Sequence, residues 1–387
     1  MALTNEHRDW LALTMVPGVG TAHFIRLLAR FRTPENVLNA SEGSLKEVVG
    51  PNLAERITHY AEAVDVDTQE RLMQEYDVSL ITLEDPAYPV RLAEIYDPPL
   101  ALFVRGELRE EDDHCVAVVG TRRATPYGIR MAEKFGRELA ARGITVVSGM
   151  AAGIDSAAHR GALEVGGRTL AVLGNGVDTV YPPQNAELMH RIIENGCVLS
   201  QFPMGVKPAK GHFPYRNRII SGMTLGTLIV EAPPNSGALI TARQAAEQGR
   251  EVFAIPGQVD VINSQGPHAL IRQGAKLVET IEDIVLELDI PAVCKQKPRV
   301  SAATPAQPAP SRRPDAADAP QSPTAPKSTP ANPREQDILS VLAPDGSFVD
   351  EIAMVCRISV SEALSTLTLL ELKGLVKQFS GKRFAPR

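Results

Sequence analysis

The chain has 387 residues, of which 44% are hydrophobic, and a formal net charge of −6. This is enough for two or three domains with a packed core, and it excludes a protein that is basic over its whole surface, though not a local basic site. Four scattered cysteines lack metal-ligand spacing, so we expect no metal and predict free thiols in a reducing cytoplasm. The N-terminus is polar and the sequence has no apolar run of 18 residues, so we expect no signal peptide and no membrane insertion.

Residues 1–78 are predicted to form an all-helical domain. The turn Val16–Gly20 separates two helical apolar patterns, and a weaker copy at 45–57 has Gly50 in its turn. Such turns resemble the helix-hairpin-helix or SAM-like fold, and hairpin amides can contact a DNA phosphate. The alternative is a small helical domain in which the glycines only form turns. Trp10 is expected to pack in the core.

Residues 79–294 alternate between short apolar runs and helical patterns. This alternation predicts an α/β domain with a mostly parallel, Rossmann-like sheet that is covered on both faces. Helices are predicted at 128–142, 154–165 and 238–248, and strands at Val116–Val119, Thr145–Ser148, Leu170–Leu173, Val198–Ser200, Leu228–Val230 and Val252–Ile255.

The first strand ends in Gly120-Thr121-Arg122-Arg123, directly before a predicted helix. A strand-to-helix turn of this kind offers backbone amides and a helix dipole to an anion, and arginine favours phosphate. The turn matches neither G-x-G-x-x-G nor a Walker loop, so no nucleotide cofactor is expected. We expect Arg122 to face the anion and Arg123 to be a flanking charge.

Three further strand ends share this character: Ser148-Gly149, Gly174–Gly176 and Asn235-Ser236-Gly237. Because the carboxyl ends of parallel strands meet at one edge, these loops are predicted to form a rim of amide donors. No acid ends the strand before Gly149, so the ribose partner of a NAD enzyme is missing.

The segment Lys210–Gly222 combines cations with aromatic rings, notably Phe213, Tyr215, Arg216, Asn217 and Arg218. Stacking rings interleaved with cations suit single-stranded nucleic acid. In the alternative interpretation, the rings are core and Arg216 and Arg218 pair with acids such as Glu231. We expect Lys210 and Phe213 to contact nucleic acid and Tyr215 to be core.

No catalytic set is apparent, because the histidines near this edge, His159 and His212 among them, match no triad or metal pattern. Asp155 is expected to complement a helix dipole. The competing hypothesis is a Rossmann-type nucleotide-processing enzyme, phosphoribohydrolase-like, with Glu231 as the catalytic carboxylate.

Residues 295–333 contain 10 of the 30 prolines and carry net charge +4, which predicts a flexible linker. Residues 334–387 are predicted to form a winged helix: helices at 335–342, 349–354 and 361–372, then a β-wing at 374–384. Seven basic and seven acidic residues balance in this module, which favours a regulatory or protein-contact role over DNA reading. Lys377, Lys382 and Arg383 of the wing are its plausible DNA contacts.

Taken in order, the motifs of the central domain resemble the DNA-processing protein A (DprA/Smf) family. The resemblance covers about 200 residues and rests on these segments: Gly120–Arg122, Ser148–His159, Gly174–Asp178, Tyr181-Pro182, Phe213–Gly222, Val230-Glu231, Ser236–Thr241, Ile255–Gly257 and Ser264–Ala275.

The resemblance implies an extended Rossmann domain that binds single-stranded DNA without catalysis. It implies protection of incoming DNA, loading of RecA recombinase during natural transformation, and a homodimer formed through the Rossmann domain, with Gly266–Ala275 as the candidate edge. Arg122 and Lys210 would hold phosphates and Phe213 would stack a base. The remaining expected contacts are Gly120, Thr121, Ser148, Gly149, Arg216, Asn217, Arg218, Asn235, Ser236 and Gly237.

Overall fold

The computed structural model describes residues 3–288 and, discontinuously, parts of 338–386. The chain forms two compact units, Met1–Ser301 and Ala302–Arg387. The first unit contains the N-terminal helices and a large sheet, and the second contains a small sheet. The predicted linker, 295–333, lies outside the described residues.

The N-terminal segment is helical, with both predicted hairpins in place. The turn Val16–Gly20 joins α1 to α2, and Gly50 joins α4 to α5. Arg56 of the second hairpin donates from Nη1 to the Pro17 carbonyl of the first at 3.1 Å, which ties the two together. The helices are α1 (Asn5–Met15), α2 (Thr21–Phe31), α3 (Pro34–Leu38), α4 (Glu42–Val49), α5 (Pro51–Thr58), α6 (Tyr60–Ala63) and α7 (Val66–Glu75).

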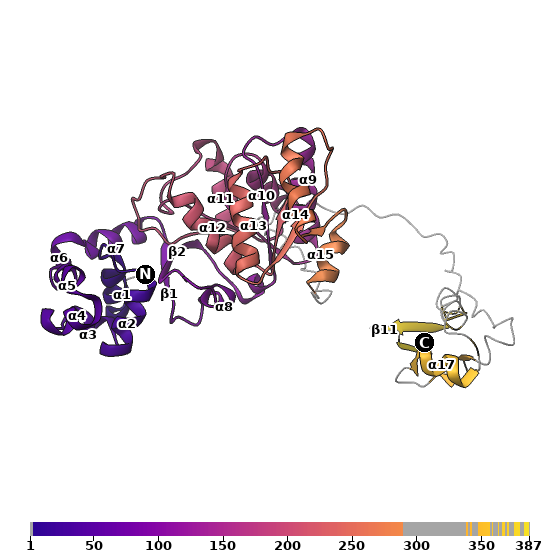
Figure 1. Cartoon of the computed structure of the whole chain (residues 1–387), viewed down its shortest axis with the longest axis horizontal. Coiled ribbons are helices and arrows are strands. Elements are labelled where there is room, and N and C mark those ends of the chain that lie inside the picture. The colour runs from indigo at the N-terminus through magenta and orange to yellow at the C-terminus, as the bar shows by residue number, and fades with distance from the viewer. Residues whose placement is uncertain are drawn as a thin grey trace, which may run out of the picture. The chain divides into compact units, whose positions relative to one another are not determined.

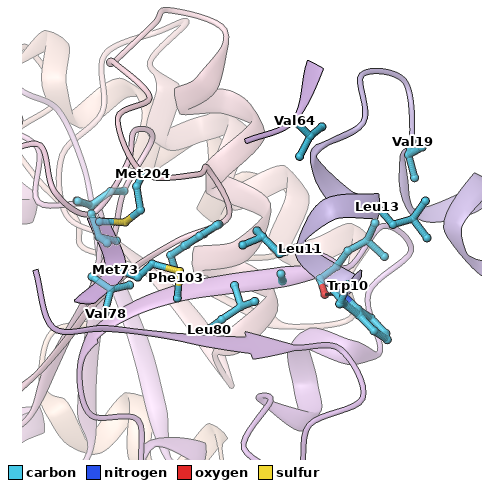
Figure 2. Close-up of a cluster of buried hydrophobic side chains, with 14 of the residues drawn as sticks. Trp10, Leu11, Leu13, Val19, Val64, Met73, Val78, Leu80, Phe103 and Met204 are labelled. Carbon is cyan, nitrogen blue, oxygen red and sulfur yellow. Dashed lines mark hydrogen bonds between the residues drawn. The ribbon is translucent and has the colours of Figure 1, made fainter. Parts of the chain in front are cut away.

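Trp10 joins these helices to the sheet, as Figure 2 shows. Its ring is 2% exposed, lies 4.7 Å from the ring of Phe24, and packs in a cluster that includes Leu80 and Phe103 of the first two strands. The indole Nε1 donates to the Leu100 carbonyl at 2.8 Å, which satisfies its buried polar atom. The core role predicted for Trp10 is confirmed.

The large sheet has nine strands in the order β1-β2-β6-β5-β4-β3-β7-β8-β9. Strand β2 runs antiparallel to β1 and β6, and all other pairs are parallel, so the prediction of a mostly parallel sheet is confirmed. The six predicted strands are β3 to β8, and the sequence analysis missed β1, β2 and β9. Their bounds are β1 (Val78–Thr82), β2 (Ala101–Gly106), β3 (Cys115–Val119), β4 (Thr145–Ser148), β5 (Thr169–Val172), β6 (Gly196–Ser200), β7 (Gly226–Ile229), β8 (Glu251–Ala254) and β9 (Lys276–Leu277).

Alternate side chains of the central strands pack on opposite faces. Val116 and Val118 of β3 lie in the cluster with Phe135 of α9, whereas Ala117 lies in the cluster with Ile219 of α12. Helices therefore cover both sides of the sheet, whose helical neighbours are labelled in Figure 1. They are α8 (Val90–Ala93), α9 (Pro126–Ala141), α10 (Ile154–Glu164), α11 (Ala186–Asn195), α12 (His212–Met223), α13 (Gly237–Glu247), α14 (Gln265–Arg272) and α15 (Ile281–Glu287), with short 3-10 turns η1 (Glu110–Asp113), η2 (Pro183–Asn185) and η3 (Ile262–Ser264).

The strand order creates a crevice at one edge. Strands β3 and β7 are neighbours in the sheet. From β3 the chain continues through α9 to β4, whereas from β7 it continues through α13 to β8, which lies in the opposite direction along the sheet. Loops that diverge in this way leave space beyond the carboxyl ends of the strands, where ligands of open α/β sheets bind.

The second unit has a three-stranded sheet, ordered β10-β12-β11, and helix α17. Its described core includes Ile338, Leu367 and Phe384. The predicted second helix and β-wing are confirmed by β10 (Ser347–Phe348), α17 (Val349–Cys356), β11 (Val376–Phe379) and β12 (Arg383–Pro386). Much of the first and third predicted helices, Lys382 and the Arg383 side chain lie outside the described residues.

Within the described part of the chain, no helix is long and apolar enough to cross a membrane. The same residues contain no group of three or more His, Cys, Asp or Glu side chains that could hold a metal ion. Cys115, Cys197 and Cys356 form no disulfide among the described residues.

His159 of α10 gives the fold a predictable pH dependence. Its fully buried ring has Nδ1 2.6 Å from Thr169 Oγ1, a hydroxyl that itself donates to the Val146 carbonyl, so Nδ1 carries the proton. Nε2 has no partner among the described atoms. Burial, followed by the Arg216 and Arg160 charges, lowers the pKa of His159 to about 3.

Between about pH 6.5 and pH 3 the unfolded histidine binds a proton that the native one does not. The free energy of unfolding should therefore decrease as the pH is lowered through this range, and this group contributes up to about 1.4 kcal/mol per pH unit to the decrease. Urea denaturation of wild type and His159→Gln from neutral to acidic pH measures this effect. The variant should lose less stability than wild type, and equal slopes would contradict the assignment.

Candidate nucleic-acid interface

A groove of about 590 Å³ lies at the carboxyl edge of the sheet. It shares Arg122, Phe213 and Arg216 with a smaller recess of about 120 Å³, which Gly149 also lines. Most of the predicted contact residues therefore converge on one concave surface. Those lining the groove are Gly120, Thr121, Arg122, Lys210, Phe213, Arg216, Asn217, Ser236 and Gly237.

The groove is basic although its domain is acidic. Residues 79–294 contain 20 Lys and Arg against 25 Asp and Glu. The charged side chains that line the groove are Arg122, Arg123, Lys210 and Arg216, with Asp155 as the single acid among them. A concave surface with one sign of charge attracts the opposite charge independently of the net charge of the protein.

Aromatic rings lie beside these cations. The Phe213 ring has the Arg122 guanidinium 4.8 Å from its centroid and the Tyr181 ring 5.6 Å away, nearly parallel at 29°. Tyr181 belongs to the Tyr181-Pro182 motif but was not among the predicted site residues. The only signal was its place after β5, whose carboxyl end reaches the same edge. Together the cation and the two rings form a surface suited to stacking.

Glu231, at the carboxyl end of β7, holds the loop that carries Arg122. Its carbonyl accepts from the Thr121 amide at 2.7 Å, and its carboxylate accepts from the Thr125 amide and hydroxyl at 2.9 and 2.5 Å. Asn263 donates from Nδ2 to the same carboxylate at 3.3 Å and to the Arg123 carbonyl at 3.1 Å. A Cβ on Gly128 would lie 2.4 Å from this carboxylate, so only glycine fits there.

The pairing of Glu231 with Arg216 or Arg218, weighed in the sequence analysis, is therefore wrong. Arg216 instead lies across Gly149, donating to the Gly149 carbonyl at 3.0 Å and to the Val172 carbonyl. A Cβ on Gly149 would meet the guanidinium at 2.5 Å. Burial lowers the pKa of Arg216 to about 10, partly opposed by Asp155, so the side chain stays charged at neutral pH.

In three of the four loops of the predicted rim of amide donors, one amide is already bonded within the chain. The Thr121 amide donates to Glu231, the Gly149 amide to Asp155 at 3.2 Å, and the Gly176 amide to the Val206 carbonyl at 2.9 Å. At the fourth loop Ser236 caps α13 by accepting from the Ala238 amide. Gly237, the first residue of α13, lines the groove.

Three predicted contacts lie outside the linings of the groove and recess. Ser148 is fully buried and donates to the Val118 carbonyl at 2.7 Å. Arg218 is 8% exposed, pairs with the Asp97 carboxylate at 3.6 Å, and donates to the Asp97 carbonyl and, at 2.6 Å, to Gln201 Oε1. The alternative that Arg218 pairs with an acid is therefore confirmed, with Asp97 in place of Glu231. Asn235 is exposed in the loop before α13. Their roles stay predictions without support from the groove geometry.

Tyr215 is not a core residue, so that prediction is wrong. Its side chain is 48% exposed, its hydroxyl donates to Asp97 at 3.2 Å, and the Arg218 guanidinium lies 4.3 Å from the ring centroid. Asp97 lies 118 residues before Tyr215 in the sequence, so the helical pattern around Tyr215 could not reveal this contact.

Fold and groove together define a Rossmann-type α/β protein with a cationic, aromatic-walled site at the switch point of its sheet. Two family models match the chain: DNA recombination-mediator protein A over residues 79–289, and the DprA winged helix domain over residues 319–382. The chain belongs to the DNA recombination-mediator protein A (DprA/Smf) family.

Relatives match this chain over half of its length or more. Protein Smf of Synechocystis sp. is 36% identical over 395 residues, covering 99% of both chains. DNA processing protein DprA of Bacillus subtilis is 41% identical over 216 residues, covering 56% of this chain and 73% of its own. The X-ray structure of DNA processing protein A from Streptococcus pneumoniae superposes with a TM-score of 0.63 at 36% identity, covering 74% of this chain and 99% of that one.

The Glu231 clamp can be tested through stability. Glu231→Ala removes the acceptor of the Thr125 and Asn263 donors, so the free energy of unfolding should fall by about 2–4 kcal/mol. Urea denaturation checks this, with Glu251→Ala, which truncates an exposed acid on β8, as the control expected within about 0.5 kcal/mol of wild type. If the two variants were equally stable, Glu231 would not hold the loop.

Proposed function

We propose that this protein binds single-stranded DNA in the groove and acts as a recombination mediator. In this role it protects incoming DNA and loads RecA recombinase during natural transformation and recombination, without catalysing a reaction itself. The single observation that carries the proposal is the Arg122–Phe213–Tyr181 stack inside a cationic groove. Membership of the DNA recombination-mediator protein A family supports the same function.

Single strands fit the site better than duplex. In a duplex the bases are already stacked on each other, whereas a single strand leaves base faces free for aromatic rings, worth about 1–3 kcal/mol per base. Phe213 and Tyr181 line both the groove and the recess, so a base can reach them from the groove. Arg122 and Lys210 then bind the flanking phosphates, and the Gly237 amide adds a neutral donor.

The partners follow from the same proposal. Single-stranded DNA is the ligand and RecA recombinase the protein partner, in the cytoplasm. The protein forms a homodimer through its Rossmann domain, with 266–275 as the candidate edge. This segment comprises most of α14, where Leu270 and Ile271 are half-buried. No cofactor is part of the proposal.

DNA binding should depend steeply on salt. Since each neutralised phosphate of a single strand contributes about −0.7 to the slope of log K against log salt, loss of Arg122 and Lys210 should flatten that slope by about 1.4. Affinity of Arg122→Ala, Lys210→Ala for an oligo-dT should fall about 10-fold or more per cation. Fluorescence anisotropy over a salt series measures both quantities.

Arg137→Ala is the matched control. It also removes one cation, but Arg137 lies on α9 and pairs with Glu164 at 3.0 Å, outside the groove lining. Wild-type affinity and slope are expected for it. A salt-insensitive wild type, or a double variant that binds like Arg137→Ala, would remove the proposal.

A nucleotide-processing enzyme is the second candidate, because Glu231 ends a central strand as a catalytic carboxylate would. The environment of Glu231 does not favour it. Its side chain is 3% exposed, its oxygens are occupied by Thr125 and Asn263, and it does not line the groove. Incubation with nucleoside monophosphates followed by chromatography should yield no free base, whereas release that Glu231→Gln abolishes would establish the enzyme.

A further inference from the structure

Asp155 occupies a place where α/β proteins often hold a phosphate. It is the second residue of α10, and its carboxylate accepts from the Gly149 amide at 3.2 Å and the Ala151 amide at 3.4 Å, while the Gly120 amide acts to lower its pKa. These amides come from the loops after β3 and β4, the two strands at the centre of the carboxyl edge. Amides that converge before a helix N-terminus form an anion cradle.

A buried cation completes this cradle. Arg216 is 4% exposed, crosses Gly149, and attracts the Asp155 carboxylate. Burial raises the pKa of Asp155, while Arg216 and the amides oppose that shift. Both hydrogen-bond partners of the carboxylate among the described residues are N–H donors, which suit an ionised oxygen. Two amide hydrogen bonds, the Gly120 amide and the charge of Arg216 therefore stabilise one carboxylate that the chain itself supplies.

We propose that Asp155 is a resident anion that fills this cradle and determines the specificity of the groove. It excludes inorganic phosphate and the phosphate of a free nucleotide from the inner position. The phosphates of a polynucleotide bind instead to the outward-facing Arg122 and Lys210. The second half of this proposal rests on the proposed DNA-binding function, whereas the first half does not.

Two physical effects exclude a second anion. The carboxylate already occupies the volume within hydrogen-bond reach of the Gly149 and Ala151 amides. A phosphate placed against it in this buried setting would also meet like-charge repulsion that solvent screens poorly. Truncation to alanine reverses both effects, because it opens the volume and leaves Arg216 and the amides without their anion.

The test uses the full chain, inorganic phosphate as the probe, and thermal denaturation at constant ionic strength with chloride as the reference salt. The Tm of Asp155→Ala should rise with phosphate by at least about 2–4 °C more than that of wild type, because a ligand that binds only the native state stabilises it. Asp155→Asn, which keeps the cradle filled, should respond like wild type. Should Asp155→Ala fold poorly, Asp155→Ser opens nearly the same volume and carries the same test.

Asp178→Ala is the matched control for charge. Asp178 also lies at this edge and accepts a single backbone amide, that of Gly205 at 3.0 Å, so the variant gains the same unit of charge without an open cradle. It should show no added response to phosphate.

A folded Asp155→Ala or Asp155→Ser that responds like wild type, or like Asp178→Ala, would overturn the proposal. Because the readout needs no DNA, loss of the DNA-binding function and loss of the resident anion are separate results. A crystal structure of the responding variant with phosphate should place an oxygen at the Gly149 and Ala151 amides, and phosphate bound elsewhere would contradict the assignment.

Discussion

The geometry of the groove depends on two buried carboxylates that hold the loops leaving the parallel sheet. Glu231 binds the loop after β3, and Asp155 binds the loop after β4. A buried carboxylate is tolerated only when hydrogen bonds replace its water, and here backbone amides supply most of them. The loop conformations and the two charges therefore stabilise each other. The backbone that carries Arg122 is set before any ligand arrives.

This arrangement explains how an acidic protein presents a basic surface. Several exposed cations elsewhere are paired with acids, as Arg137 is with Glu164 and Arg142 with Glu282. Arg122 instead lies over the ring of Phe213, a neutral partner that leaves its charge available to a phosphate. The acids closest to the groove are turned inward against amides and against Arg216. Net charge is thus a poor guide to the local field, which depends on which acids are already satisfied by the backbone.

The sequence predicted the central fold well because strands buried on both faces are nearly continuous apolar runs, as Val116–Val119 is. Strand β1 was not predicted because it is not a continuous apolar run: its burial alternates, with Ser79 exposed and Leu80 buried. It also lies at the edge of the sheet, where it pairs antiparallel with β2. The convergence of Arg122, Lys210 and Phe213 was predictable, since parallel strands bring their carboxyl ends together. Which amides are already used within the chain was not predictable, because Glu231 binds Thr125 across 106 residues of sequence, and because nothing in the local pattern shows that Asp155 turns back to Gly149 and Ala151.

The buried residues that hold the loops and the exposed cations of the groove have different roles, so changes in stability and changes in affinity arise at different positions. Asp155, Glu231, Arg216 and Asn263 lie at or below 9% exposure and bind each other or the backbone, so changes there act first on folding. Arg122 and Lys210 are exposed, so their substitution changes the groove potential at little expense to the core. In the proposed function, substitutions at the outer cations can therefore change the affinity for a nucleic-acid backbone while the inner carboxylates keep the loop conformations unchanged. The same division makes the inner cradle a filter: an anion enters only where the chain has not already placed one of its own.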